Sequence, residues 1–377
     1  MWKQIASTGA ILLFMCQTAH SIELKGDTAV GYDSNPFRLR DGLSPDGGAF
    51  VDIGLRAKHV FENNFGLKGV LKNRSYESSL DNGDAVYMDL GAQYKKRSAL
   101  WGKKVHFLAG GGYDYKDKTY VRRSTGEKAT FNGQNIEDRY DYDSWKANAL
   151  GSVRLKKGLH TELEVNYRSR DYENYHIEGL SDLDYDQVIL INEWRYTQNE
   201  NSKFKLALRI GRRDFDNKRE KDKNGDDIAG TDLEYDYYGA KFSHRYKLNP
   251  DFNVKWEAEY EERRDNSSSG YYDTDEWNVG VGFRYRIGND WHLIADASYI
   301  DRSYSDRLAP VDEDDIESPD KNGYAFEVQI ERNLGDFYEL ATKAYFGASY
   351  DDYDSHESSY VYDRYQAFVG IKVQFDN

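Results

Sequence analysis

The strongest constraint on this chain is an alternation of apolar and polar side chains, which recurs in segments of roughly ten residues between Thr28 and Phe375. Residues 277–285 and 371–375 show it without interruption. A β-strand places successive side chains on opposite faces, so each segment has one apolar face and one polar face. Segments of this kind can form a wall between hydrocarbon and water.

The pattern predicts about sixteen strands, joined by connections that are alternately short and long. Short connections stand at 62–64, 156–158, 249–251, 288–290 and 334–336. The long ones, such as 116–139, 214–230 and 301–322, are rich in charged residues, and the last two are acidic on balance. We therefore expect an all-β fold, a transmembrane antiparallel up-and-down β-barrel of about sixteen strands. The predicted strand centres are Ala29, Ile53, Lys68, Leu90, Phe107, Ala149, Val165, Leu190, Leu206, Ala240, Lys255, Val281, Ala295, Val328, Ala344 and Val369.

The first residues are typical of a secretory signal peptide. Lys3 supplies positive charge, residues 5–15 are apolar, and residues 19–21 offer small side chains for cleavage. We expect a signal peptide over 1–21 and one barrel domain over 22–377. Cys16 is the single cysteine and would leave with the signal, so no disulfide is expected. Short turns at one end and an even strand number predict the bacterial outer membrane, with both termini in the periplasm.

Charge and hydropathy exclude some classes of protein. The 66 acidic residues outnumber the 51 basic ones, for a net charge of −15, which argues against nucleic acid as a partner. No stretch after residue 21 is long and apolar enough for a membrane-spanning helix, and the mean hydropathy is −0.87. A barrel reconciles these values with a membrane, because only alternate residues meet lipid. A periplasmic propeller or solenoid is the alternative, but no repeat of constant period is visible.

Proline and aromatic residues give two further indications. All five prolines, Pro36, Pro45, Pro250, Pro310 and Pro319, fall in predicted loops or turns, as expected for a residue that cannot donate a ladder hydrogen bond. Many aromatic residues stand near strand ends, where girdles at the lipid headgroups would place them. The predicted girdle residues are Tyr113, Tyr115, Tyr140, Tyr142, Trp194, Tyr196, Tyr235, Tyr237, Trp291, Tyr299 and Tyr365.

The chain resembles the porin-like outer-membrane β-barrels of Gram-negative bacteria over its mature length. Residues 31–37, Gly-Tyr-Asp-Ser-Asn-Pro-Phe at the end of the first strand, look like the opening of the putative β-barrel porin-2 group. That resemblance implies an association with surface polysaccharide secretion. The last strand is similar to the barrel-assembly signal, although Asp376 and Asn377 follow the aromatic Phe375.

If the apolar positions face lipid, the polar positions of the same strands face the lumen. The expected lumen is basic over the first nine strands and more acidic from the eleventh, which would select ions. Equally, the charges could merely neutralise one another. The residues predicted to line the pore are Arg56, Lys58, Lys68, Lys72, Arg74, Arg154, Arg168, Arg170, Lys205, Arg209, Arg213, Glu257, Glu259 and Glu261.

Three functions remain open. The first is a porin-like channel for passive diffusion of small hydrophilic or charged solutes past Arg56, Lys72, Lys205 and Arg209, opposed to Glu257 and Glu259. The second is an outer-membrane conduit for exopolysaccharide that acts with periplasmic partners, and tyrosine rings that stack on sugars would suit it. The third is a rim enzyme or adhesin anchored by the barrel. Expected partners are outer-membrane lipid, lipopolysaccharide, the solute and, by analogy with porin trimers, further copies of the chain.

No cofactor, metal site or catalytic group is predicted. The acidic stretches 222–227 and 312–315 offer hard oxygen ligands for Ca²⁺ or Mg²⁺, but solvated turns explain them better. His176 and His356 are the histidines of the long loops, and the acids near His356 are expected by chance in so acidic a loop. The glycines 110–112 precede no helix, so we expect them to relieve crowding at a bend in the wall.

Overall fold

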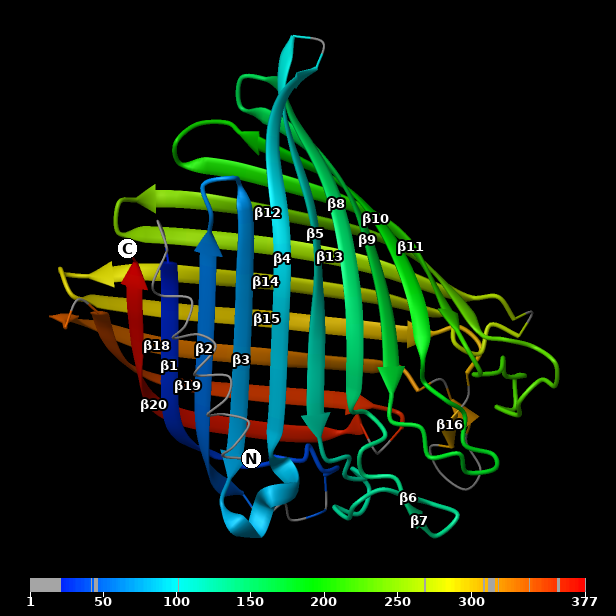
Figure 1. Cartoon of the computed structure of the whole chain (residues 1–377). Coiled ribbons are helices and arrows are strands. Elements are labelled where there is room, and N and C mark those ends of the chain that lie inside the picture. The colour runs from blue at the N-terminus through cyan, green and yellow to red at the C-terminus, as the bar shows by residue number, and fades with distance from the viewer. Residues whose placement is uncertain are drawn as a thin grey trace.

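The computed structural model describes residues 22–41, 43, 47–100, 102–267, 269–307, 309–310, 316–317, 319–338, 340–357 and 360–376. Within them, sixteen antiparallel strands form a closed barrel in which each strand pairs with its neighbour in the chain and the last pairs with the first (Figure 1). The predicted fold class is confirmed, and every predicted strand centre lies in a strand. The proposed signal peptide falls outside the described residues.

The barrel strands are β1 (Ile22–Asp33), β2 (Gly48–Val60), β3 (Phe65–Tyr76), β4 (Ala85–Leu100), β5 (Lys103–Lys118), β8 (Tyr142–Lys156), β9 (Leu159–Tyr172), β10 (Tyr185–Thr197), β11 (Ser202–Phe215), β12 (Glu234–Asn249), β13 (Phe252–Asp265), β14 (Thr274–Ile287), β15 (Trp291–Tyr304), β18 (Lys321–Phe337), β19 (Leu340–Ser355) and β20 (Tyr362–Asp376). Two-residue strands in the long loops form small separate sheets, namely β6 (Thr130–Phe131) with β7 (Gln134–Asn135), and β16 (Ala309–Pro310) with β17 (Ile316–Glu317). The 3₁₀ segment η2 (Ser78–Gly83) follows β3.

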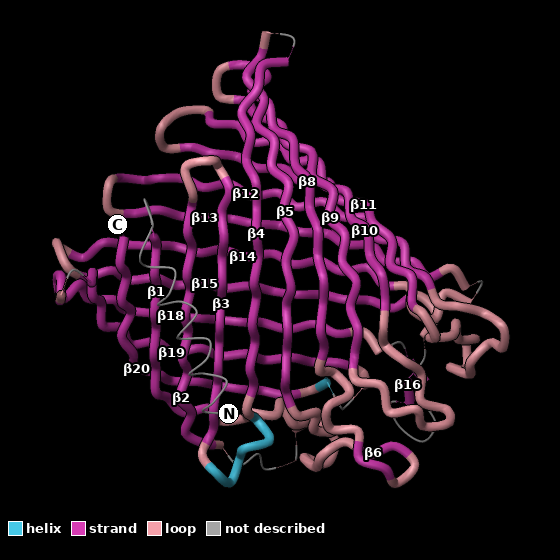
Figure 2. Tube along the Cα trace, viewed as in Figure 1, coloured by secondary structure: helices cyan, strands magenta, loops and turns pink. Residues whose placement is uncertain are grey.

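Short turns lie at one end of the barrel and long loops at the other (Figure 2). Of the five prolines, Pro36, Pro250 and Pro319 lie in loops or turns, and Pro310 lies in β16 within a long loop. Pro45 falls outside the described residues. In the described part of the chain, no helix has the length and apolar content needed to cross a membrane.

The two faces of the wall differ as the alternation predicts. Val30 pairs with Val51, and both side chains are exposed on the outside, as are Leu208 at the centre of β11 and Val369 on β20. Large apolar side chains are exposed on every barrel strand except β3, and together they form an outward apolar belt. A closed ring leaves no strand edge unpaired over the belt, which is what spanning hydrocarbon requires.

The aromatic prediction is right for one group of residues and wrong for another. By register, Tyr113, Tyr115, Trp194, Tyr196, Trp291, Tyr299 and Tyr365 lie on the outward face. However, Tyr142, Tyr235 and Tyr237 share the inward face with Lys146 and Lys241, and the last two tyrosines are buried there, while Tyr140 lies in a loop. The alternation itself carried this signal, because Tyr238, not Tyr237, has the parity of Ala240 and Phe242.

The seam where β1 meets β20 explains the Gly-Tyr-Asp-Ser-Asn-Pro-Phe segment. Asp33 is fully buried and accepts hydrogen bonds from Arg364 (2.9 and 2.5 Å), from Gln366 (2.7 Å) and from the Tyr76 hydroxyl (2.7 Å). Two residues on, the Asn35 side chain donates to the carbonyls of Leu39 and Asp363 at 3.0 and 3.1 Å. These contacts fasten the first strand and first loop to the last strand.

Candidate functional site: a cationic lumen and its mouth

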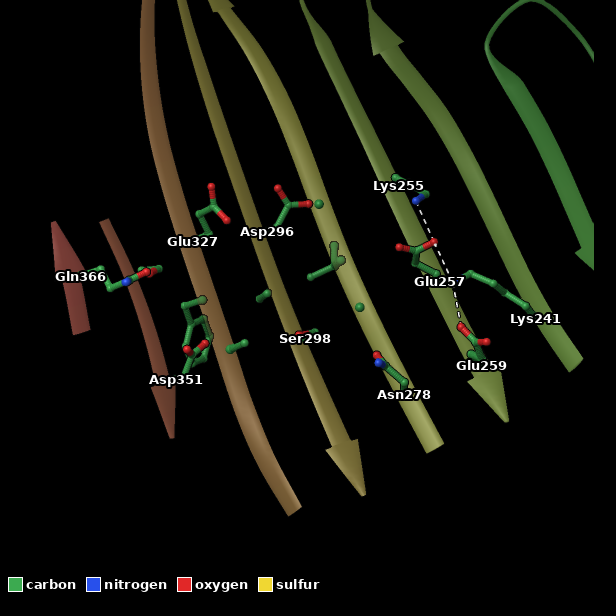
Figure 3. A pocket seen from close by; sticks show the side chains of 17 residues that line it. Lys241, Lys255, Glu257, Glu259, Asn278, Asp296, Ser298, Glu327, Asp351 and Gln366 are labelled. Atoms are coloured by element: carbon green, nitrogen blue, oxygen red, sulfur yellow. Dashed lines mark hydrogen bonds and ion pairs between the residues drawn. The ribbon is translucent and has the colours of Figure 1, made fainter. Parts of the chain in front are cut away.

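Every residue predicted to line the pore lies on the inward face of its strand. Residues paired across two neighbouring strands have side chains on the same face. Followed from strand to strand, the pairing register from β2 to β13 places Arg56, Lys72, Lys146, Arg209 and Glu261 all on one face. That the solute touches these side chains stays a prediction. Figure 3 shows part of this face, with Lys241, Lys255, Glu257 and Glu259 side by side on β12 and β13.

The charges on this face are largely paired along the wall. Arg209 on β11 contacts Glu259 at 2.5 Å and Glu261 at 2.8 Å on β13, reaching across Gly239 of β12, which has no side chain to block it. Lys205 contacts the buried Glu193 at 2.5 Å. The expectation that Arg209 faces Glu259 across the lumen is therefore wrong. β11 and β13 are separated only by β12, so Arg209 and Glu259 meet along the same part of the wall.

The glycines of β5 serve a similar purpose. Gly112 faces inward, and a Cβ there would lie 2.4 Å from the Leu90 carbonyl oxygen and 3.1 Å from Cε of Lys146. Its absence lets Lys146 of β8 cross β5 to an ion pair with Asp89 of β4, while Asp114 lies 3.2 Å from the same ammonium group. A side chain at position 112 would therefore be crowded by the backbone of β4 and by Lys146, as the prediction that glycine relieves crowding expects.

A second group of inward cations has no acidic partner. Arg56, Lys72 and Arg168 form no ion pair within the described residues, and Nε of Arg168 is buried without a hydrogen-bond partner. Acidic side chains gather elsewhere, around a cavity of about 500 Å³ on the inner wall of β12 to β20 that includes Asp296, Glu327 and Asp351 (Figure 3). The lumen is thus basic on one side and more acidic on the other.

Backbone hydrogen bonds join three long loops over the lumen. The amide of Arg40, in the loop 34–47, donates to the carbonyl of Arg123 in the loop 119–141 at 3.0 Å. The next amide, Asp41, donates to the carbonyl of Val361 in the loop 356–361 at 2.9 Å. Because β5 and β20 are separated by four strands of the closed ring, these loops reach over the opening.

The three joined loops and the adjoining ends of β18, β19 and β20 gather cations around tyrosine rings. We call these residues the mouth cluster: Arg38, Arg123, Lys321, Tyr353, Tyr360 and Tyr362. Arg38 and Arg123 lie 5.8 and 5.7 Å from the centre of the buried Tyr362 ring, and Lys321 lies 6.0 Å from it. Lys321 also lies 4.2 Å from Tyr353. Ring faces attract cations, but no acidic side chain pairs with these three within the described residues. An anion would find uncompensated positive charge here.

Another cationic group lies where the loop 216–233 meets the end of β11. Lys218 lies over the rings of Phe215 and Tyr272 at 4.9 and 4.7 Å, and Arg213 lies 4.2 Å from the ring of Tyr185. Burial, with further lowering by nearby arginines and Lys221, brings the pKa of Lys218 down to about 8. Sequence analysis missed this group, because the inward parity of Tyr185, Phe215 and Tyr235 was not used.

The acidic residues that precede His356 lie at the end of β19. Asp351 and Asp352, upstream of His356, lie on opposite faces of β19. Among the residues described, no group of three or more His, Cys, Asp or Glu could hold a metal ion. In the stretch 222–227, Asp222 accepts hydrogen bonds from the amides of Asn224 and Asp226, so it makes a turn. The acidic stretch 312–315 lies outside the described residues.

Comparison with known proteins gives a likeness of architecture. No protein-family model matches the chain and no curated protein matches it, so the resemblance to the porin-2 group stays a prediction. A solved structure described as a bacterial polysaccharide outer membrane secretin is 10% identical, with a TM-score of 0.45 over 94% of this chain and 98% of that one.

Two further solved structures are similar to the same degree. Outer-membrane expressed OmpT of Vibrio cholerae is 10% identical, with a TM-score of 0.46 over 95% of this chain and 99% of its own. OccAB3 of Acinetobacter baumannii is 10% identical, with a TM-score of 0.47 over 95% of this chain and 100% of its own. Values this low leave the function to be argued from the lumen itself.

Proposed function

We propose that this protein is an outer-membrane channel through which small hydrophilic solutes diffuse, with a preference for anions. The apolar belt around a closed ring of strands supports insertion into a membrane, and the polar inner face supports passage of water and solutes. Short turns would face the periplasm and long loops the exterior. A barrel of this strand number is wide enough for an aqueous pathway.

The observation that carries the anion preference is the mouth cluster. Arg38, Arg123 and Lys321 surround one tyrosine ring without an acidic partner, although the chain as a whole carries a charge of −15. Arg38 and Arg123 lie in loops that reach over the opening, and Lys321 lies at the adjoining end of β18, so a solute that uses the lumen would pass near these cations. Fixed charge at a narrowing attracts ions of opposite sign and repels those of like sign.

Reversal potentials of the purified protein in planar bilayers, under a KCl gradient, test this proposal. We expect current with chloride more permeant than potassium, and a fall in that ratio in the double variant Arg38→Gln, Arg123→Gln. Asn replacement of Lys156 and Lys157 at the short-turn end is the matched control and should leave the ratio near the wild-type value. A protein without ion current, or one that prefers potassium, would contradict the proposal.

A second candidate, passage of sugar chains, is favoured by the rings that line the mouth. The partly exposed Tyr353 and Tyr360 combine flat apolar faces with the neighbouring Lys321, an arrangement that suits sugars bearing carboxylates. Blockage of the ion current by acidic oligosaccharides, and not by neutral ones of equal length, would support it. Enzymatic or adhesive activity has no comparable support in the described residues, and we propose that the barrel is not an enzyme.

A further inference from the structure

The hairpin of β4 and β5 extends beyond the rest of the wall at the short-turn end (Figure 1). Pairing of β4 with β3 ends at Tyr94, and pairing of β5 with β8 ends at Val105, yet β4 and β5 continue to pair with each other as far as Leu100 and Lys103. The result is a two-stranded ribbon, residues 95–100 and 102–104, that leaves the barrel. We call it the basic ribbon.

Every charged side chain of the basic ribbon is a cation. Lys95, Lys96, Arg97, Lys103 and Lys104 are all exposed, and none forms a hydrogen bond or an ion pair through its side chain within the described residues. The chain contains 66 acidic residues, but none lies between Asp89 and Asp114. Such a run in so acidic a chain separates the ribbon electrostatically from the rest of the molecule.

The basic ribbon continues the inner wall of the barrel. Lys95 and Arg97 have the inward parity of Gly91 and Asp89, and Lys104 has that of Gly112 and Asp114. On the adjacent strand β3, Lys68 pairs with Gly91 and Lys72 pairs with Tyr87, so cations stand on the same face inside the barrel. A negatively charged chain lying on the ribbon would meet further cations as it entered the lumen.

We infer that the basic ribbon captures an anionic carbohydrate chain at the short-turn mouth and directs it along the β3–β5 wall, an inference that rests on the proposed function of the lumen as a conduit. A single small anion would gain little from exposed, mobile lysines. A polymer with a carboxylate on each sugar engages several at once, and the weak contacts add. A protein partner is disfavoured because lysine-rich surfaces lack the apolar core of stable interfaces.

The test measures binding of a polygalacturonate oligomer of about ten sugars to the full-length protein in detergent at low salt, where exposed charges are least screened. The ribbon variant replaces Lys95, Arg97, Lys103 and Lys104 with Gln, which removes all three inward cations of the ribbon. The control variant replaces Lys156, Lys157, Arg245 and Lys247 with Gln, which removes the same number of lysines and arginines at the same end. We expect the ribbon variant to bind roughly tenfold more weakly and the control to bind like wild type.

Chloride current in planar bilayers separates this inference from the proposed function. If the ribbon variant conducts normally but loses oligomer binding, both ideas stand. If the ribbon variant and the control variant bind the oligomer equally well, the capture role is overturned, even if the current is normal. The same holds if the ribbon variant loses only adhesion to phosphatidylglycerol vesicles, because the ribbon would then be a lipid contact. If the wild-type protein carries no chloride current, the proposed channel function is overturned instead.

Discussion

Single residues decide how this barrel closes. Asp33 is a buried carboxylate that receives hydrogen bonds from two residues of β20 and one of β3, so it ties the first strand to β20 on one side and, across β2, to β3 on the other. Asp27, on the same strand and the same inward face, has no ion pair within the described residues. Two aspartates of one strand thus differ in role, because only one of them lies at the junction with Arg364.

Replacement of Asp33 by Asn should destabilise the barrel strongly. Among the described residues, it leaves the buried Arg364 with only the more distant Asp351, at 3.8 Å, as an acidic partner. Loss of one member of a buried ion pair costs about 3–5 kcal/mol. Asp27→Asn is the matched control and should cost little. Urea unfolding in lipid vesicles, followed by the heat-dependent shift of the folded band in electrophoresis, measures both. Equal stability of the two variants would mean that the seam is held by the backbone ladder alone.

At the scale of elements, the positions of strands can be predicted from the sequence, whereas the contacts between loops cannot. Strands follow from a two-residue period, which is local, so 277–285 and 371–375 could be placed without a structure. The joining of Arg40 to Arg123 and of Asp41 to Val361 depends on loops far apart in the chain, and no local pattern encodes it. Lys205 and Arg209 lie between these cases: their inward direction was predictable, but their pairing with Glu193 and Glu259 was not.

The loops should make the anion preference depend on pH. Lys218 has a pKa lowered to about 8 by burial and by Arg263, Arg139, Arg213 and Lys221 around it, so it loses its charge as the pH rises through 8. Asp141 has a pKa raised to about 7 by burial, with additional raising by Asp117 and Asp138, so it gains negative charge as the pH rises through 7. Both changes remove positive charge from the same end of the barrel.

We therefore expect the chloride-to-potassium permeability ratio to fall between pH 6 and pH 9. Reversal potentials across this range, in the wild type and in the double variant Lys218→Met, Asp141→Asn, provide the measurement. The variant should show a flatter dependence than the wild type, because neither Lys218 nor Asp141 can titrate in it. A variant that keeps the wild-type slope would place the titrating groups elsewhere.

The whole molecule separates its charges by position. Cations without acidic partners, such as Arg56, Lys72 and Arg168, face inward, whereas much of the acidic excess lies in the long loops, and the outward belt is apolar. Each strand contributes to both solvents through alternate residues, so the separation needs no long apolar segment. This explains why a mean hydropathy of −0.87 is compatible with a membrane wall. It also means that the effect of a new charge on stability should depend on whether its position in the strand faces outward or inward.

Neighbouring positions at the centre of β11 test that dependence directly. Leu208 points outward with an exposed fraction of 44%, and Ala207 points inward beside Lys241 and Glu193. Leu208→Lys places an ammonium group in hydrocarbon and should cost about 2–4 kcal/mol near the midplane of a bilayer. Ala207→Lys places the same group in the lumen, where it should leave the barrel stable and raise the chloride preference. Unfolding in vesicles and reversal potentials measure the two effects, and similar losses of stability in both variants would show that the wall does not separate lipid from water.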